Sequence, residues 1–537
     1  MCADLALYNG KLYTMDERRR YATAIAIRDN HILAVGDDVT IRNLLHVGGT
    51  AIDLRGKCVI PGLIDAHLHF EWLSLEMKNV NAETPTLDEA LRRVKERAGQ
   101  TPIGTWIRGH GWNQTVWGGA FPTKADLDRV APEHPVYLSA KSGHAAWVNS
   151  PALKMAGVTS ATPNPPGGEI TRVAPSDGEP TGILLENAMD LVSEIIPQAT
   201  AAEVADAMRD VIPLAHRAGL TGVHDFDGAR AFQAWQILRE RSELRLRVSK
   251  TVPVYLQEHA IALGLRSGFG DDWLRINSVK AFADGALGPR TALMIDPYEG
   301  EPENRGIVVT DKEEMIENVR KASEAGLSST IHAIGDKANH DVLDVFETVR
   351  AEERERGETH LRHRLEHVQV LHPDDYGRLG RLNVIASMQP IHATSDMLMA
   401  DKHWGARRSA GAYAWRTQLN AGAALAFGSD APVETFDPLA GIHAAVTRRR
   451  ADGSPGPEGW FPEQRLTVHE AVYAYTMGAS YAAYEERQKG SLTPGKLADL
   501  VIVDRDIFKV DPMDILRAKV VGTIVDGKFA WRDPFFD

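Results

Sequence analysis

The feature that most constrains the fold is a regular alternation of short apolar runs with longer amphipathic stretches through the middle of the chain. The short runs predict buried strands, and stretches such as Lys312–Ala325 and Asn339–Arg354 predict helices. Alternating strands and helices predict a parallel sheet covered by helices, and eight such units indicate a (β/α)8 barrel of the TIM type. The predicted strands are Val59–Ala66, Val136–Ala140, Thr221–Asp225, Arg275–Ala281, Ser328–His332, His363–His367, Val384–Gln389 and Ala424–Phe427.

The two ends of the chain have a different pattern, in which apolar and polar residues alternate between turn dipeptides. This pattern is typical of antiparallel strands with one wet face. We therefore expect residues 1–58 and 481–537 to form the two halves of one composite β-sandwich, with a barrel of residues 59–480 between them. The strands are expected at Ala3–Tyr8, Ala24–Arg28, His31–Val35, Ala498–Val503 and Val520–Val525, with hairpin turns at Asn9-Gly10, Asp29-Asn30 and Asp526-Gly527.

Residues from about 77 to 210 are too numerous for the loops around the second predicted strand. This region contains Pro/Gly-rich stretches such as Ala161–Gly168. We interpret it as an inserted cap or lid beside the barrel mouth. The predicted fold class is thus α/β, a TIM barrel with a composite β-sandwich and a cap insertion.

Composition limits the classes of function. The chain has 537 residues, of which 43% are hydrophobic and 25% charged, as in ordinary globular proteins. No apolar run reaches about 18 residues, so no membrane span is expected. A net charge of −13 argues against nucleic-acid binding, and two cysteines with no basic leader segment suit a reducing, cytoplasmic location. We expect a small molecule as the partner.

The sharpest local motif is His67-Leu68-His69, at the end of the segment Val59–His69. Side chains two residues apart on a strand point to the same face, so both imidazoles can reach one metal ion. By itself, the pair could equally be two surface or hydrogen-bonded histidines.

Further candidate ligands fall at the ends of other predicted strands, where barrel active sites are built. A lone histidine there usually makes an ordinary hydrogen bond, Lys280 could belong to an ion pair, and Asp430 could cap a helix. These structural roles, taken one by one, do not explain why every candidate falls at the end of a predicted strand. The candidates are Lys280, His332, His367 and Asp430.

With these residues in view, the chain resembles the amidohydrolase superfamily, and within it the long members similar to N-substituted formamide deformylase. The resemblance covers nearly the whole chain and is specific for the superfamily, but much less so for the substrate. The matching segments are Asn9-Gly10, Thr14-Met15, Val59–His69, Lys141–Ser150, Gly182–Asn187, Lys280–Gly285 and Gly490–Leu500.

The resemblance implies a role for each candidate ligand. His67 and His69 would bind a buried metal, His332 and His367 a second one, and Asp430 would bind metal and transfer protons. Lys280 matches a position that often holds an N6-carboxylated lysine bridging two metals; without the carbamate, the site would hold one. Zinc is the expected ion, although such sites also accept Mn²⁺ or Fe²⁺. The resemblance also allows a homodimer.

Several residues are weaker candidates for substrate contact. Trp112 could form an apolar or cation-binding wall, although packing is the commoner role of a tryptophan. His144 could donate a hydrogen bond to substrate. Asp284 and Arg290 could contact substrate or form an internal ion pair, and His224 could contact substrate or support the metal ligands.

The implied activity is metal-assisted hydrolysis of a C–N bond in an amide or formamide. A bound metal lowers the pKa of water to about 7 and polarises the carbonyl group, while Asp430 accepts a proton and passes it to the leaving nitrogen. The alternatives are hydrolysis of a carbamate, ester or cyclic amide, a non-hydrolytic reaction at the same metal site, and a catalytically silent binding protein.

Overall fold

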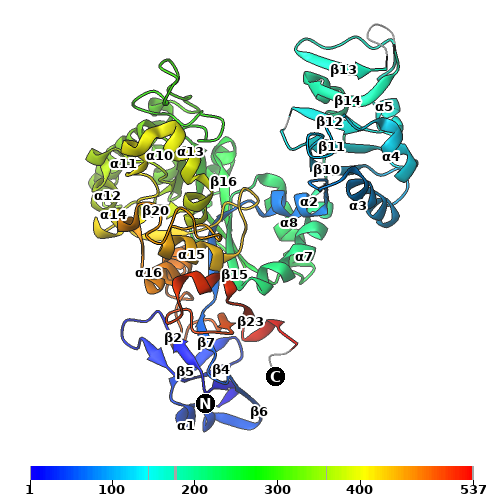
Figure 1. Ribbon diagram of the computed structural model, residues 1–537. Helices are drawn as coiled ribbons and strands as arrows, with labels where there is room; N and C mark the ends of the chain where they lie inside the picture. The colour runs from blue at the N-terminus through cyan, green and yellow to red at the C-terminus, as the bar shows by residue number, and fades with distance from the viewer. Residues whose placement is uncertain (1, 143, 174–177, 359, 535–537) are drawn as a thin grey trace. The chain divides into compact units, whose positions relative to one another are not determined.

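The computed structural model describes residues 2–534 except residues 143, 174–177 and 359 (Figure 1). The chain forms two compact units. The first comprises Met1–Trp72 with Met208–Asp537, and the second comprises Leu73–Ala207. The first unit contains both ends of the chain and all the strands of the parallel sheet.

The centre of the first unit is an eight-stranded parallel sheet with helices around it (Figure 1). Neighbouring strands follow chain order, which is the arrangement of a TIM barrel. The predicted fold class is therefore confirmed. The strands are β8 (Leu63–Leu68), β15 (Leu220–Asp225), β16 (Arg247–Pro253), β17 (Leu274–Phe282), β18 (Ser328–Ala333), β19 (Arg364–His367), β20 (Ile385–Met388) and β21 (Leu425–Phe427).

The helices of this unit follow the strands along the chain. Two of the long ones, α10 and α11, are amphipathic, as the sequence pattern predicted. The helices are α2 (Phe70–Lys78) and α7 (Ala201–Arg217), which both extend into the second unit, α8 (Ala229–Glu240), α9 (Gln257–Ala262), α10 (Lys312–Glu324), α11 (Asp336–Glu355), α12 (Arg378–Leu382), α13 (Pro390–Ser409), α14 (Trp415–Asn420), α15 (Pro438–Thr447), α16 (Val468–Tyr473) and α17 (Ala479–Ala482).

One predicted barrel strand is wrong. Val136–Ala140 is a strand of the second unit, and the barrel strand that the sequence analysis missed is β16. This strand contains Arg247 and Lys250, so its sequence does not show the apolar run that predicts a buried strand. Both side chains are nevertheless fully buried. Lys250 Nζ donates to the backbone oxygens of Asp225 and Thr251, so its burial costs no hydrogen bond.

The barrel closes between its first and last strands. The backbone nitrogen of Asp430 donates to the carbonyl of His67 at 2.7 Å, and that of His69 donates to Ala431 at 2.8 Å. The buried carboxylate of Asp65 accepts from the hydroxyl of Ser429 at 2.5 Å and from the backbone nitrogen of the same residue at 3.0 Å. These bonds fix the end of β8 against the segment that follows β21.

The β-sandwich predicted from both chain ends is confirmed. One sheet has the order β5-β4-β1-β6 and the other β24-β23-β22-β7-β2-β3. Their shared core includes Leu7, Ile25 and Val59 from the first part of the chain and Leu500 and Ile524 from the last. The strands are β1 (Ala3–Tyr8), β2 (Lys11–Tyr13), β3 (Tyr21–Ala22), β4 (Ala24–Arg28), β5 (His31–Gly36), β6 (Leu45–Asp53), β7 (Cys58–Pro61), β22 (Leu500–Val503), β23 (Val520–Val525) and β24 (Lys528–Arg532), and α1 (Asp38–Arg42) lies between β5 and β6.

Two of the three predicted hairpin turns are confirmed. Asp29-Asn30 joins the paired strands β4 and β5, and Asp526-Gly527 joins β23 and β24. The prediction for Asn9-Gly10 is wrong, because β1 and β2 pair with other strands in different sheets. This dipeptide instead carries the chain from one sheet of the sandwich to the other.

The predicted strand Val59–Ala66 is divided at Gly62. β7 belongs to the sandwich and β8 to the barrel, so the chain changes sheets at this glycine. A Cβ atom at Gly62 would lie 2.2 Å from Thr221 Oγ1, so a larger residue would push β8 away from β15. The glycine therefore permits the close packing that starts the barrel.

Barrel and sandwich are joined by a buried ion pair. The guanidinium of Arg247 donates to both carboxylate oxygens of Asp499, at 2.5 and 2.9 Å, and the two side chains are 1% and 3% exposed. Arg247→Ala is expected to lower the free energy of unfolding by about 3–5 kcal/mol, because Asp499 would keep a buried, unpaired charge. Urea unfolding of the first unit measures the change in its free energy of unfolding.

The exposed pair Arg239–Asp271 provides a matched control for this measurement. Its side chains are 47% and 51% exposed, so Arg239→Ala is expected to cost less than about 1 kcal/mol. Equal shifts for the two variants would contradict a stabilising role for the buried pair.

The second unit has its own mixed six-stranded sheet, in the order β13-β14-β12-β11-β10-β9, and its own hydrophobic core. The proposed role of residues 77–210 as a cap stays a prediction. The elements are β9 (Val80–Asn81), α3 (Leu87–Gln100), β10 (Ile107–Trp112), α4 (Lys124–Val130), β11 (Val136–Ala140), β12 (Ala145–Val148), α5 (Ser150–Met155), β13 (Gly168–Arg172), β14 (Pro180–Glu186) and α6 (Asp190–Ser193).

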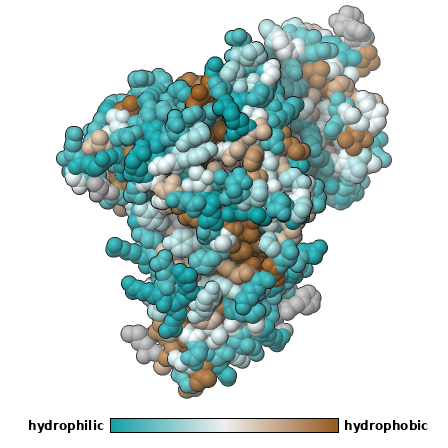
Figure 2. Space-filling view, turned by 60° about the vertical axis from the view of Figure 1, so that its left-hand side comes forward, coloured by the Kyte–Doolittle hydropathy of each residue, from teal (hydrophilic) through white to brown (hydrophobic). Residues whose placement is uncertain are grey.

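None of the helices in the described ranges combines the length and the apolar character that crossing a bilayer requires. The face of the molecule in Figure 2 is mostly hydrophilic, with hydrophobic residues scattered over it in small groups.

Candidate functional site

The barrel strands bring most of the predicted ligands to their carboxyl ends. His67 lies on β8 and His69 directly after it, Lys280 near the end of β17, His332 on β18 and His367 at the end of β19. Asp430 follows β21 by three residues. Because parallel strands end on the same side of a barrel, these six residues from five strands surround one region.

The tightest group consists of His67, His367 and Asp430. One ligand atom from each lies within 4.8 Å of the others, and all three residues are buried. His69 joins the group from the same side, because Nε2 of His67 and Nε2 of His69 lie 3.4 and 3.5 Å from the same oxygen, Asp430 Oδ1. Imidazole nitrogens and a carboxylate converging in this way form the donor set of a transition-metal site.

Each of the three imidazoles is oriented through its other ring nitrogen. Nδ1 of His67 donates to Glu366 Oε2 at 2.5 Å, and Nδ1 of His69 donates to Asp227 Oδ1 at 3.1 Å. Nδ1 of His367 donates to Gln389 Oε1 at 2.8 Å. With the proton held on Nδ1, Nε2 keeps a free lone pair, which is the state in which histidine binds a metal.

Burial favours the neutral imidazoles that a metal needs. It lowers the pKa of His67 to about 4 and holds the pKa of His367 well below its ordinary value. Burial would raise the pKa of Asp430, but His67 and His69 outweigh it and keep that pKa well below its usual range. His69 is the exception: burial would lower its pKa, but its carboxylate neighbours Asp227 and Asp430 raise it to about 9. His67 and His367 thus offer neutral nitrogens beside an ionised carboxylate, and a divalent cation binding to His69 would displace a proton.

His332 and Lys280 lie beside this group. The ring centroids of His332 and His367 are 4.5 Å apart, and Nε2 of His332 donates to the carbonyl of Gly285 at 2.9 Å. Lys280 is buried, and burial lowers its pKa to about 8. Its Nζ lies 4.9 and 4.6 Å from the ring centroids of Phe226 and Phe282, and it has no hydrogen-bond partner among the described residues.

The comparisons with known proteins agree with this geometry. The model of the amidohydrolase family matches residues 50–530. The chain belongs to this family. It is 36% identical to the protein LONG AFTER FAR-RED 3 of Arabidopsis thaliana, over 98% of this chain and 91% of that one. It is 30% identical to the N-substituted formamide deformylase of Arthrobacter pascens, over 98% and 97% of the two chains.

A solved structure of the same architecture extends the match. The crystal structure of an uncharacterized metal-dependent hydrolase from Pyrococcus furiosus superposes with a TM-score of 0.77 at 30% identity, covering 94% of this chain and 100% of that chain. The resemblance to the amidohydrolases inferred from the sequence is thus confirmed.

A buried ion pair supports the cluster in this amidohydrolase. Glu366, which orients His67, is held by Arg364, whose Nε lies 2.8 Å from Glu366 Oε1. Burial would raise the pKa of Glu366, but Arg364 and His67 bring it down to about 2. Sequence reasoning missed both residues; the available signal was two charged side chains inside an otherwise buried strand.

His224 and Asp284, two of the predicted substrate contacts of the first unit, lie beside the cluster and contact its residues or their supports, with Asp284 Oδ1 3.5 Å from His332 Nε2. His224 is buried, and its Nδ1 accepts from Arg364 at 2.9 Å, so it belongs to the support of the cluster. Asp284 accepts from the backbone nitrogens of Ile334 and Gly335. The alternative of an Asp284–Arg290 ion pair is wrong, because Arg290 lies 2.8 Å from Glu301 instead.

The two predicted contacts in the second unit differ from each other. Trp112 is fully buried in that unit's core, and its Nε1 donates to the carbonyl of Leu138, so the structure gives it a packing role in place of the predicted pocket wall. His144 is exposed and pairs with Glu186 at 3.0 Å. It lies between β11 and β12, two strands of the second unit.

Other residues near the cluster were not predicted. Trp72 and Phe282 are half-exposed aromatic side chains whose ring centroids lie 5.9 Å from His69 and 5.2 Å from His332. His392, on α13, lies against Asp430. No local motif marks these positions, because each approaches the cluster only when the strands are assembled.

Two residues of the cluster have a strained backbone. His367 has a φ of 71° and Asp430 a φ of 61°, which side chains other than glycine rarely adopt. Such conformations cost about 1–3 kcal/mol each and concentrate at functional sites. Here the two backbone conformations direct the side chains of His367 and Asp430, each at or after the end of a strand, toward the cluster.

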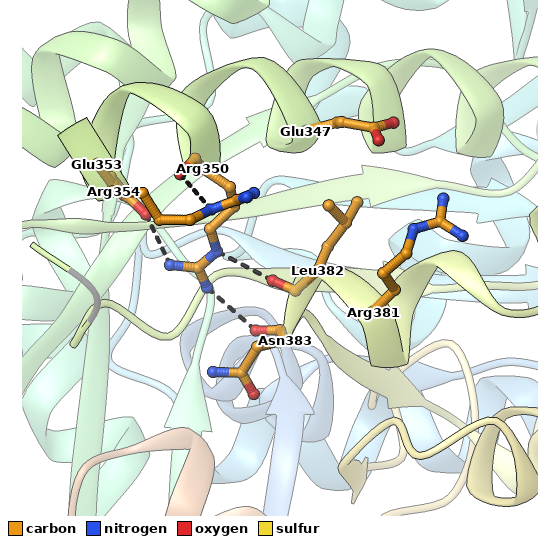
Figure 3. Close-up of a pocket in the computed structure, with 7 residues that line it drawn as sticks. All are labelled: Glu347, Arg350, Glu353, Arg354, Arg381, Leu382 and Asn383. Atoms are coloured by element: carbon orange, nitrogen blue, oxygen red, sulfur yellow. Dashed lines mark hydrogen bonds and ion pairs between the residues drawn. The ribbon is translucent and has the colours of Figure 1, made fainter.

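A cavity of about 400 Å³ lies away from the cluster, before the amino end of β20 (Figure 3). Its central side chain is Arg350, which donates to the carbonyls of Leu382 and Asn383 and to Glu353. These bonds hold the end of α11 against the start of β20. None of the predicted site residues lines this cavity.

Proposed function

We propose that the protein is a metal-dependent hydrolase that cleaves the C–N bond of an amide or N-substituted formamide. The observation that carries this proposal is the convergence of His67, His69, His367 and Asp430 on one point, with each imidazole oriented by an acceptor behind it. A silent binding protein has no chemical need for such an arrangement.

The residues present fit a divalent metal, and zinc suits their nitrogen and oxygen donors. His67, His69, His367 and Asp430 would hold it, and His332 with Lys280 would hold a second ion. A metal bound there would supply Lewis acidity, lowering the pKa of water and polarising a carbonyl group.

The remaining chemistry belongs to Asp430. Its Oδ1 is the oxygen nearest to His67 and His69, whereas its Oδ2 is the oxygen nearest to His392. This leaves Oδ2 to accept a proton from the attacking water and to deliver it to the leaving nitrogen as the C–N bond breaks. The products are a carboxylic acid and an amine.

The choice of a C–N bond follows the formamide deformylase relative, which matches this chain over almost its full length. Hydrolysis of a carbamate, ester or cyclic amide is the second candidate, since the same groups would polarise any of these carbonyls. Half-exposed Trp72 and Phe282 beside the cluster favour a substrate with an apolar substituent.

The test is a screen of N-acyl and N-formyl amines against metal-loaded protein, with amine release as the signal. We expect turnover of at least one N-alkyl or N-aryl formamide and loss of that turnover after chelation. If the protein hydrolysed esters or carbamates but none of the amides, hydrolysis of another carbonyl bond would replace the proposed activity.

We also propose that Lys280 carries a carbamate. An ammonium cannot bind a cation, whereas a carbamate supplies two oxygens. Lys280 is buried, and its Nζ lies 4.9 and 4.6 Å from the ring centroids of Phe226 and Phe282, while Glu366 and Asp430 are close enough to act on its charge. Protein loaded with metal in ¹³C-bicarbonate is expected to show a carbamate signal by ¹³C NMR, and Lys280→Met is expected to remove it. A wild-type spectrum identical to that of Lys280→Met would contradict this proposal.

A further inference from the structure

His392 occupies an unusual position beside the catalytic carboxylate. It lies in the first turn of α13, which begins at Pro390 directly after β20. Its ring is parallel to that of His367, with centroids 6.0 Å apart and 10° between the planes. Gln389, which orients His367, immediately precedes this helix, so one short segment positions both imidazoles.

The Nε2 atom of His392 is buried and has no hydrogen-bond partner in the described structure. Its nearest charged neighbour is Asp430 Oδ2, at 3.8 Å. This distance is too long for a hydrogen bond, and a buried polar atom without a partner is costly. The geometry suits a third polar atom that contacts both groups.

The two oxygens of Asp430 divide the site into two sides. Oδ1 faces the imidazoles of His67 and His69, where the metal would bind. Oδ2 faces His392 and is the oxygen that would return a proton to the leaving nitrogen. The atom expected between Oδ2 and His392 Nε2 is therefore the scissile nitrogen of the substrate.

We infer that His392 is a catalytic residue that binds the N–H of the scissile amide. This inference rests on the proposed function and narrows its substrate class to secondary amides and formamides, whose nitrogen keeps one hydrogen. The N–H donates to the lone pair of Nε2, which turns the nitrogen's own lone pair toward Asp430 Oδ2.

The reaction balances with these groups and water. Water gives one proton to Asp430 Oδ2 and its oxygen bonds to the carbonyl carbon. The C–N bond then breaks, its electron pair stays on nitrogen, and the proton on Oδ2 moves to that nitrogen. His392 accepts a hydrogen bond throughout and exchanges no proton.

The test compares N-butylformamide, which has an N–H, with N-butyl-N-methylformamide, which has none. His392→Leu removes the acceptor, and His392→Gln keeps an oxygen acceptor near the position of Nε2. The control is His403→Leu on the same helix, whose side chain is half-buried and lies about three turns further along the chain from His392.

We expect His392→Leu to lower kcat/KM for the secondary formamide at least about tenfold and to leave the slower tertiary compound nearly unchanged. His392→Gln is expected to retain most of the preference, and His403→Leu all of it. Metal content per chain should stay at the wild-type level. An unchanged preference in His392→Leu, or a loss of activity that parallels a loss of metal, would overturn the inference.

A binding measurement separates this inference from the proposed function. In the Asp430→Asn background, ligand-observed NMR should show tighter binding of N-butylformamide than of its N-methyl derivative, and His392→Leu should remove that difference. If wild-type protein hydrolyses neither compound, the proposed activity on these formamides fails, while the binding difference still decides the role of His392. Absence of the difference overturns that role.

Discussion

Asp430→Asn is expected to reduce kcat by at least about 10³-fold while leaving the fold intact. The carboxamide cannot accept the proton that Oδ2 takes from water, and it is a weaker ligand than a carboxylate. The substitution preserves shape, and the backbone bond from residue 430 to the carbonyl of His67 remains. Steady-state kinetics on the best substrate of the screen, with thermal unfolding of the same preparation, measures both effects.

Asp311→Asn is the matched control for this substitution. Asp311 caps α10 by accepting from the backbone nitrogen of Glu314, and asparagine caps helices about as well. The control is expected to keep the wild-type kcat and melting temperature. If Asp430→Asn also turned over at the wild-type rate, Asp430 could not be the proton-transferring group.

His67→Ala is expected to have the second-largest effect, on metal content. His67 belongs to the tightest donor group, and its loss removes one of the three ligand atoms of that group. Wild-type protein supplemented with Zn²⁺ is expected to hold about one or two ions per chain, and the variant fewer than about 0.2. Elemental analysis after gel filtration measures this ratio.

Glu366→Gln tests how His67 is oriented. A glutamine can still accept from Nδ1 but lacks the charge, so metal affinity is expected to fall about 10–100-fold. Because the change also leaves Arg364 with an unpaired buried charge, unfolding must be measured alongside.

His46→Ala, at an exposed position in the sandwich, is the control for the metal measurement on His67→Ala. Full metal content in His67→Ala would show that the metal binds elsewhere.

Local sequence patterns were sufficient wherever a strand was apolar and flanked by turns. The buried runs at Thr221–Asp225 and Ser328–His332 predicted barrel strands because such runs can be stable only inside a covered parallel sheet. The same reasoning failed for β16, where Arg247 and Lys250 are buried through partners far away in the sequence. It also failed for Val136–Ala140, whose apolar pattern fits the interior of either sheet.

The candidate site divides in the same way. The positions of His67, His367 and Asp430 could be predicted, since a polar residue at the end of a buried strand must lie at the carboxyl edge of the barrel. Their supporting partners could not. Glu366 and Gln389 are recognisable only by what they contact, and His392 only because β20 and β21 end side by side.

The sequence by itself determined the family, the barrel, the sandwich built from both chain ends and the residues that offer ligands. The barrel, the sandwich and the candidate ligands follow from periodicity and residue type, which are local, whereas the family follows from the resemblance of whole motifs. Only the tertiary structure decided which ligands converge, how each imidazole is oriented, and that an unpartnered nitrogen of His392 faces Asp430 Oδ2. These depend on distances of a few ångströms between strands remote in the chain, which no local pattern encodes.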